Sequence, residues 1–246
     1  MYPYIQIILP SYAFLAFLGV LVTLTFLYLN IDSIGISFSG FLVLSLKCAI
    51  GCFIGSKLLY FITQIPNLLS SFSVNSLITA FLHSGYVFYG GLLGVLFTVW
   101  LSVRNKPERA QSYFNFLAPA IPLFHFFGRI GCFLTGCCYG KDFAKPVVLF
   151  NSIILYQIPV QLIEAVFELC LFFVIYLLQR RRTPHLIYLY LTSYSVFRFI
   201  IEFFRGDEVR GIYFNLSTAQ WISIFIFGYV LFKFWRLNKS RSVSQT

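Results

Sequence analysis

The chain has 246 residues, of which 59% are hydrophobic and only 11% are charged, and 31 of them are phenylalanine. This composition excludes an ordinary soluble domain and indicates a membrane protein whose main solvent is the bilayer. The formal charge of +10 does not indicate a nucleic-acid partner, because the basic residues form short clusters beside apolar runs, as juxtamembrane loops do.

The apolar runs predict about seven membrane-spanning helices, since one span needs about 20 apolar residues. Their expected bounds are Tyr12–Asn30, Phe41–Thr63, Tyr86–Val103, Asn115–Thr135, Val160–Leu178, Leu186–Phe204 and Thr218–Phe234. The predicted fold is an all-α polytopic membrane protein. It consists of one transmembrane domain over residues 1–238 and a polar, disordered cytoplasmic tail over residues 239–246.

Clusters of Lys and Arg follow the third, fifth and seventh spans. Basic loops stay on the cytoplasmic side, so we expect the N terminus outside and the C terminus in the cytoplasm. Between the second and third spans, Gln64 to Ser84 keeps apolar residues at helical spacing. This stretch predicts a short amphipathic segment lying on the outer membrane surface.

Arg129 in the fourth span is the first candidate functional residue. A guanidinium stays charged at any cellular pH, so near lipid it must face protein, water or an anionic partner. His125 lies one helical turn earlier on the same face, so the pair can approach a common ligand. Four glycines surround them, and either tight helix packing or amides offered to an anion would explain these: Gly128, Gly131, Gly136 and Gly140.

The sixth span carries four polar side chains at spacings of four, four and three residues, which place them on one helical face. They are Tyr194, Arg198, Glu202 and Arg205. Arg198 and Glu202 can neutralise each other as a buried pair. Arg205 and Arg129 then lack partners, and this surplus of positive charge favours an anion, of which a lipid phosphate is the natural one in a membrane.

The fifth span contains Gln161 and two carboxylates one turn apart, Glu164 and Glu168. We expect one or both carboxylates to meet Arg or Lys of other spans, although a purely structural ion pair is an equally good interpretation. In the second span, Lys57, Lys47 and Tyr60 are candidates for the same interior. Lys47 can also extend to a membrane interface.

The cysteines do not follow a known metal pattern. Cys132, Cys137 and Cys138 give C-x4-C-C, which differs from the C-x2-C pairs of structural zinc sites. Most of the six cysteines lie in apolar runs, where thiols pack as small hydrophobic groups. We therefore predict neither a metal site nor a cofactor.

Several runs together resemble the prolipoprotein diacylglyceryl transferases of bacterial membranes, over nearly the whole chain. They are SYAFLAFLG from Ser11, GSKLLY from Gly55, VFYGGLLGV from Val87, GRIGCFLTGCCYG from Gly128, PVQLIEA from Pro159, RFIIEFFR from Arg198 and LSTAQWIS from Leu216. The resemblance implies a multi-pass protein of the bacterial cytoplasmic (inner) membrane. It also implies transfer of a diacylglyceryl group from phosphatidylglycerol to the lipobox cysteine in the signal peptide of a preprolipoprotein, with release of glycerol phosphate.

Carried over by position, the resemblance implies that Arg129 binds phosphatidylglycerol and that Arg198 is needed for activity. Further residues fall on family positions: Tyr12, Gly140, Gln161, Glu164, Tyr194, Glu202 and Gln220. The chain also departs from the family pattern. Cys132, Thr135 and Cys137 replace two Asn and a Glu of the signature, Tyr89 replaces the His of an H-G-G motif that continues with Gly90 and Gly91, and Lys57 replaces an arginine.

The implied reaction needs a base for the thiol proton. With Tyr89 in place of the family histidine, His125 is the predicted substitute base, and Tyr89 is the weaker alternative because its phenol has a pKa near 10. Arg129 and Arg198 are expected to offset charge on the departing phosphate. A set of supporting residues is Lys57, Gln161, Glu164, Arg205, Gly90 and Gly91. The alternative function is a homologue that binds phospholipid or modifies a different acceptor.

Overall fold

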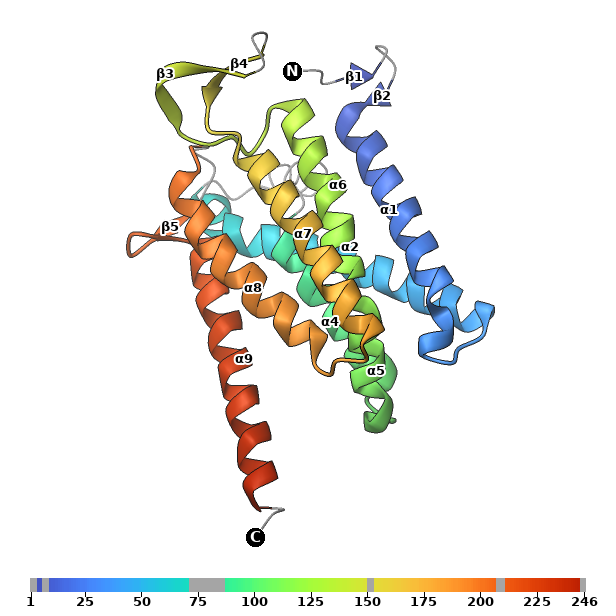
Figure 1. The fold of residues 1–246 in the computed structure, drawn as a ribbon. Helices are drawn as coiled ribbons and strands as arrows, with labels where there is room; N and C mark the ends of the chain where they lie inside the picture. The colour runs from blue at the N-terminus through green and yellow to red at the C-terminus, as the bar shows by residue number, and fades with distance from the viewer. Residues whose placement is uncertain (1–3, 6–8, 71–86, 150–152, 207–210, 244–246) are drawn as a thin grey trace. The chain divides into compact units, whose positions relative to one another are not determined.

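The structure is a computed structural model that describes residues 4–5, 9–70, 87–149, 153–206 and 211–243. Helices dominate these residues (Figure 1). They are α1 (Ser11–Leu29), α2 (Phe38–Ser70), α4 (Phe88–Val103), α5 (Pro107–Leu117), α6 (Ala120–Thr135), α7 (Val160–Arg180), α8 (Leu186–Ile201) and α9 (Thr218–Val243). Two short 3-10 turns accompany them, η1 (Ile31–Ser33) and η2 (Glu202–Phe204).

Three short antiparallel strand pairs accompany the helices among the described residues, and the mostly helical fold agrees with the predicted all-α class. The pairs are β1 (Tyr4–Ile5) with β2 (Leu9–Pro10), β3 (Asp142–Leu149) with β4 (Ile153–Gln157), and β5 (Ile212–Tyr213) with β6 (Leu216–Ser217). The β3–β4 hairpin connects α6 to α7, and its register is irregular between Asp142 and Val147. The protein is therefore mostly helical, with short hairpins at the ends of helices.

Within the described residues, six helical segments are long and apolar enough to cross a membrane, which supports a polytopic membrane protein. They are Ser11–Leu29, Phe38–Thr63, Pro107–Thr135, Val160–Arg180, Leu186–Phe204 and Thr218–Arg236. The third predicted span corresponds to α4, which has only 16 residues. The total of seven spans and the orientation of the termini stay predictions.

Some predicted boundaries differ from the observed ones. The span expected from Asn115 is interrupted between α5 and α6 at Pro119, because proline has no N–H and disfavours helical backbone before it. Helix α2 continues to Ser70, so the start of the predicted amphipathic segment belongs to it; residues 71–84 lie outside the described residues. Helix α9 continues to Val243, so the prediction of a disordered tail from Lys239 is wrong for residues 239–243.

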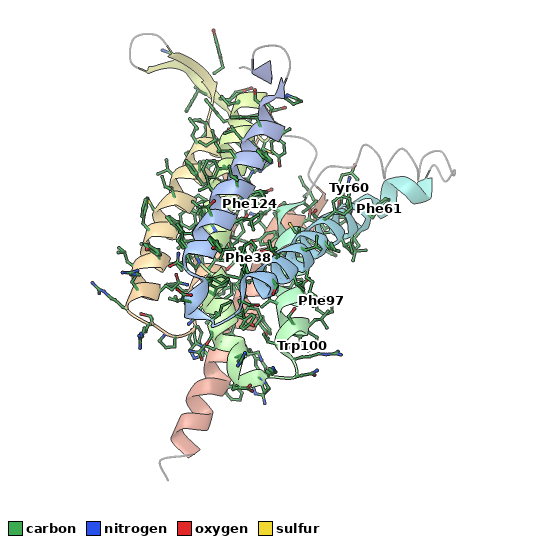
Figure 2. The ribbon with its side chains drawn as sticks, turned by 90° about the vertical axis from the view of Figure 1, so that its right-hand side faces the viewer. Phe38, Tyr60, Phe61, Phe97, Trp100 and Phe124 are labelled. Atoms are coloured by element: carbon green, nitrogen blue, oxygen red, sulfur yellow. The ribbon has the colours of Figure 1, made fainter. Side chains whose placement is uncertain are left out.

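Large apolar side chains lie exposed along the helices, as a lipid environment requires. Figure 2 shows Phe97 and Trp100 projecting from α4, where their rings stack with centroids 5.7 Å apart. Both rings are about half exposed, at 58% and 49%. Since such a surface is unfavourable in water, these side chains are suited to face acyl chains.

The chain divides into two compact units, Leu27–Leu117 and the remainder, and each is described by itself. In the unit Leu27–Leu117, α2 packs on α4 through facing glycines. A Cβ added at Gly55 or at Gly90 would collide with the backbone carbonyl of the other, and the same holds for Gly51 and Gly94. Two small-xxx-small patterns thus let the backbones meet directly.

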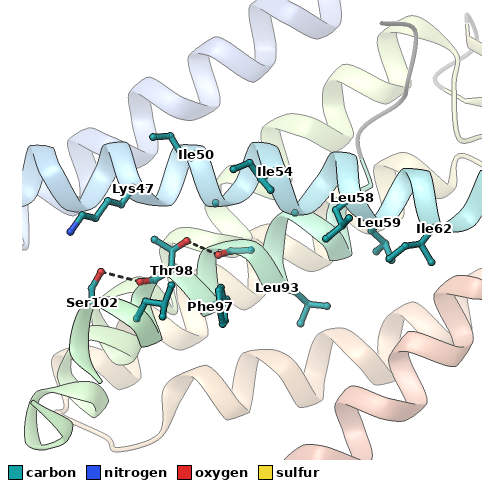
Figure 3. A pocket seen from close by; sticks show the side chains of 15 residues that line it. Lys47, Ile50, Ile54, Leu58, Leu59, Ile62, Leu93, Phe97, Thr98 and Ser102 are labelled. Carbon is teal, nitrogen blue, oxygen red and sulfur yellow. Dashed lines mark hydrogen bonds between the residues drawn. The ribbon is translucent and has the colours of Figure 1, made fainter. Parts of the chain in front are cut away.

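A cavity of about 740 Å³ lies beside this contact between α2 and α4. Figure 3 shows its apolar lining, with Lys47 at one end and the Thr98 and Ser102 hydroxyls bonded to carbonyls of their own helix. Lys47 is exposed and lines this cavity. Its predicted place in a shared interior with Lys57 and Tyr60 stays a prediction.

In the other unit, α7 lies between α6 and α8 (Figure 1). Apolar packing holds α1 to them, with Gly19 against the Phe127 side chain and Phe26 edge-on to Phe172. Such packing orients the polar faces of α6, α7 and α8 toward one another. These three faces carry most of the candidate residues.

Candidate active site

Six ionisable residues are buried together between α6, α7, α8 and η2, each at most 7% exposed. They are His125, Arg129, Glu164, Glu168, Arg198 and Glu202. Burying charge is costly unless each charge is paired and hydrogen-bonded. Ion pairs and hydrogen bonds join all six side chains into one continuous network.

Glu164 is the centre of this network. Its Oε2 forms an ion pair with Arg129 Nη1 at 3.1 Å, and its Oε1 accepts a hydrogen bond from Arg198 Nη1 at 2.9 Å. Arg198 Nη2 also contacts Glu202 Oε2 at 2.7 Å, one helical turn along. Glu164 therefore holds two guanidinium groups side by side, and Glu202 supplies the second carboxylate that balances their charge.

His125 extends the network from Arg129 to Glu168. Arg129 Nε donates to His125 Nε2 at 3.1 Å, and His125 Nδ1 lies 2.8 Å from Glu168 Oε1. A guanidinium can only donate, so Nε2 must carry a lone pair and Nδ1 must carry the hydrogen. The imidazole is thus neutral in this arrangement, and Glu168 fixes its tautomer.

Several predicted contacts are confirmed and one is wrong. Arg198 pairs with Glu202, and Glu164 meets arginines of two other helices, as predicted. Arg129, which we expected to lack a partner, has Glu164. The case for an anion at Arg129 therefore rests on the paired guanidiniums and their remaining donors rather than on an unpaired charge. Glu168 contacts His125 instead of a cation.

Two tyrosines border the network. The Tyr194 ring meets the His125 ring edge-on at 5.4 Å and is almost fully buried. Tyr12 packs beside Gly131 of α6, where an added Cβ would lie 3.1 Å from its ring. Tyr194 therefore lies beside the α6 face that carries His125, and Tyr12 contacts α6 at Gly131. Their catalytic and binding roles stay predictions.

Gln161 and Gly140 hold the loop that follows α6. Gln161 Nε2 donates to the Cys137 carbonyl at 2.6 Å. Gly140 bonds to the Ile158 carbonyl and bridges to Arg205, and an added Cβ would lie 2.5 Å from that carbonyl oxygen. Glycine is thus required at position 140 by the close approach of two backbones. Arg205 is buried at this junction.

Gln220 takes part in a capping box at the start of α9. Its backbone N–H donates to Ser217 Oγ at 3.2 Å, and its side-chain Oε1 accepts from the Ser217 N–H at 2.9 Å. This reciprocal pair satisfies backbone donors that a helix start leaves open. The described contacts of Gln220 are therefore structural, and its predicted substrate contact stays a prediction.

The remaining predicted residues belong to the unit Leu27–Leu117. Lys57 and Tyr89 are buried there. Gly90 provides the close contact with α2 described above, and Gly91 lies against Cys52, whose Sγ would be 2.9 Å from an added Cβ. Helix packing thus accounts for both glycines, and the catalytic role of Tyr89 stays a prediction.

The three cysteines after Arg129 come together at the end of α6. Their Sγ atoms all lie within 4.8 Å of one another. Hydrogen bonds with the Cys132 and Cys137 thiols, and then the positive charges of Arg129 and Arg205, hold the pKa of the Cys138 thiol below its ordinary value. Sequence reasoning missed this cluster because the spacing fits no known pattern. It also missed the contact of Glu168 with His125.

Comparisons with known proteins show the family to which the chain belongs. Residues 4–236 match the family model for prolipoprotein diacylglyceryl transferase. The chain is 36% identical over 200 residues to the phosphatidylglycerol–prolipoprotein diacylglyceryl transferase of Clostridium tetani (strain Massachusetts / E88), covering 77% of this chain and 78% of the relative. It is 32% identical over 206 residues to transferase 2 of Clostridium perfringens (strain 13 / Type A), covering 78% and 77%. The chain belongs to the prolipoprotein diacylglyceryl transferase family.

Proposed function

We propose that this chain transfers a diacylglyceryl group from phosphatidylglycerol to the lipobox cysteine thiol of a preprolipoprotein signal peptide. The observation that carries the proposal is the pair of guanidiniums, Arg129 and Arg198, which Glu164 holds inside a bundle of apolar helices. The names of the relatives, which refer to phosphatidylglycerol and prolipoprotein, support it.

The chemistry is a substitution at carbon. The cysteine sulfur attacks the glyceryl carbon bonded to the phosphate oxygen, a C–S bond forms, and the C–O bond breaks. Its electron pair leaves with the oxygen as glycerol phosphate, and the thiol proton passes to a base. Negative charge grows on the departing phosphate, so guanidiniums that contact this phosphate stabilise the transition state more than the ground state. A guanidinium has five donors in a planar fork, and Arg129 uses Nε and Nη1 for its described partners.

His125 is the proposed base. Since Glu168 fixes the hydrogen on Nδ1, the lone pair lies on Nε2, where it accepts from Arg129. Movement of Arg129 toward a phosphate oxygen would release this lone pair for the thiol proton. Substrate binding and base activation would then be one event.

The surrounding residues have proposed supporting roles. Tyr194 packs on the His125 ring and Tyr12 lies beside α6, so both are placed to border the lipid substrate. Glu202 holds the second side of Arg198. The roles of Tyr89 as alternative base and of Lys57 as a supporting residue stay predictions, and Arg205 adds positive charge for the phosphate.

We place the protein in the bacterial inner membrane with the N terminus outside and the C terminus in the cytoplasm. Basic residues cluster after the third, fifth and seventh predicted spans, including Arg104, Arg181 and Arg236. With this orientation the loop after α6 lies on the outer side. Arg129 would then act in the outer half of the bilayer, near lipid headgroups.

The test is a transfer assay with purified protein, phosphatidylglycerol and a lipobox peptide, read by the mass of the peptide. Arg129→Ala and Arg198→Ala should each lower the transfer rate by at least about 100-fold, the scale of losing one oxyanion donor. The matched control is Arg181→Ala, which removes an exposed guanidinium. Retention of phosphatidylglycerol without any gain in peptide mass by the unaltered chain would reject the transferase and leave the lipid-binding alternative.

A further inference from the structure

The end of α6 carries a cluster of three thiols that the transfer reaction does not use. Cys132 lies in the last turn of the helix, and Cys137 and Cys138 follow in the loop. Their Sγ atoms lie within 4.8 Å of one another, the one such group of ligand atoms among the described residues. We propose that Cys132, Cys137 and Cys138 form a binding site for a thiophilic d10 metal ion, with Zn²⁺ as the physiological ion.

Backbone geometry brings the three thiols together. Gly136 adopts the left-handed conformation at φ 75° and ends the helix, and Cys138 is also left-handed at φ 60°. The N–H of Cys137 bonds back to the Cys132 carbonyl at 3.1 Å. The chain therefore reverses over the end of α6, which converts an irregular sequence spacing into a compact group.

Other parts of the fold hold this reversal in place. Gln161 of α7 donates to the Cys137 carbonyl at 2.6 Å. On the other side, Gly206 N–H bonds to the Tyr139 carbonyl at 3.0 Å. The ligand loop is thus fixed from two directions, which lowers the ordering cost of binding an ion.

The sulfur positions suit zinc coordination. A Zn–S bond of about 2.3 Å in tetrahedral geometry places sulfurs about 3.8 Å apart. The upper limit of 4.8 Å exceeds that value by about 1 Å, a gap that small thiol rotations can close. Three protein ligands leave a fourth position for water or another ligand. Cys137 is exposed, so an ion can enter from solvent.

Charge balance also favours the site. Three thiolates and one divalent ion carry a net charge of −1, and two arginines adjoin the cluster: Arg129 on α6, and Arg205, which bridges to Gly140 two residues after Cys138. Arg129 lies three residues before Cys132, so both are on one face of α6. A bound ion would thus clamp the helix end next to the guanidinium that we assign to the phosphate. The site itself does not depend on the transfer reaction.

The test uses the full chain in detergent, reduced and treated with chelator, with Cd²⁺ as the spectroscopic probe. A thiolate-to-cadmium band in the ultraviolet should saturate at about one ion per chain and disappear when Zn²⁺ is added in excess. Cys132→Ser, Cys137→Ser and Cys138→Ser should each weaken binding strongly, and the triple variant should lose the band. Cys170→Ser and Cys48→Ser are the matched controls, since these free thiols lie on other helices.

Protection from alkylation supplies a second readout. With Cd²⁺ bound, peptide mass spectrometry should find Cys132, Cys137 and Cys138 unmodified while exposed Cys170 reacts. The proposal is overturned if the triple variant keeps the band, or if the unaltered chain shows none. It is also overturned if Cys132→Ser binds as tightly as the parent, because two thiols alone would then suffice. Unchanged helical circular dichroism of each variant separates lost ligands from lost folding.

Discussion

Arg129 and His125 are bonded through Nε and Nε2 at 3.1 Å, and the direction of this bond fixes the protonation of the imidazole. The imidazole must accept, so it is neutral, and Glu168 holds its other nitrogen at 2.8 Å. The same histidine can therefore orient the guanidinium and serve as a base once that guanidinium moves.

These two roles of His125 can be separated by substitution. His125→Ala removes both, whereas His125→Gln keeps an acceptor for Arg129 but cannot take a proton at neutral pH. If His125 is the base, both variants lose transfer by at least about 100-fold, the usual contribution of a general base. If His125→Gln alone kept activity near the parental rate, His125 would position Arg129 and would not be the base. His185→Asn is the control, because Asn tolerates the left-handed backbone at that position.

Loss of the Glu164 charge should destabilise the protein. Glu164→Ala leaves two buried guanidiniums without their shared carboxylate, and breaking a buried pair in this way costs about 3–5 kcal/mol. The expected result is a lower free energy of unfolding, measured in detergent by loss of helical circular dichroism. Glu108→Gln, on the exposed surface of α5, should have almost no effect. Equal stability of Glu164→Ala and the parent would show that the bridge contributes little.

The glycine contact between α2 and α4 predicts a position-specific penalty. Gly90→Ala puts a methyl group against the Gly55 carbonyl, and overpacking of this kind typically costs about 1–3 kcal/mol. Gly128→Ala makes the same change within α6, where an added Cβ meets nothing within 4 Å, and it should be tolerated. Thermal inactivation of the two variants compares them directly. A larger loss in Gly128→Ala would contradict the packing account.

Substitution of Gln220 can distinguish a role in capping helix α9 from a role in binding the substrate. If its role is structural, Gln220→Ala lowers stability by about 0.5–2 kcal/mol and leaves the KM for phosphatidylglycerol unchanged. Ser217→Ala removes the other half of the capping box and should reproduce that loss. A raised KM at parental stability in Gln220→Ala alone would instead make this residue part of the lipid site.

Hydropathy located the helices well because each span must satisfy its own backbone in lipid. It did not find the β3–β4 hairpin, since Asp142 to Gln157 mixes apolar and polar residues without clear alternation and contains Pro146. The presence of Pro119 in the sequence could have predicted the break between α5 and α6. The apolar residues on both sides concealed it within one predicted span.

Site residues were predictable where partners share a helix. Spacing placed His125 with Arg129 and Arg198 with Glu202, and both contacts are present. Partners on different helices depend on how those helices pack, which local spacing does not encode. Glu168 and His125 are 43 residues apart, so no local pattern connects them.

Because Arg129 and Arg198 share the carboxylate of Glu164, the effects of substitutions at these two arginines are coupled. Once either guanidinium is lost, Glu164 binds only the remaining guanidinium. That guanidinium then shifts from the position it has in the intact network. The two substitutions should therefore be strongly non-additive, with the second adding little to the damage of the first. Selection would then act on these three positions together, and a change at one would be tolerated only with a compensating change at another.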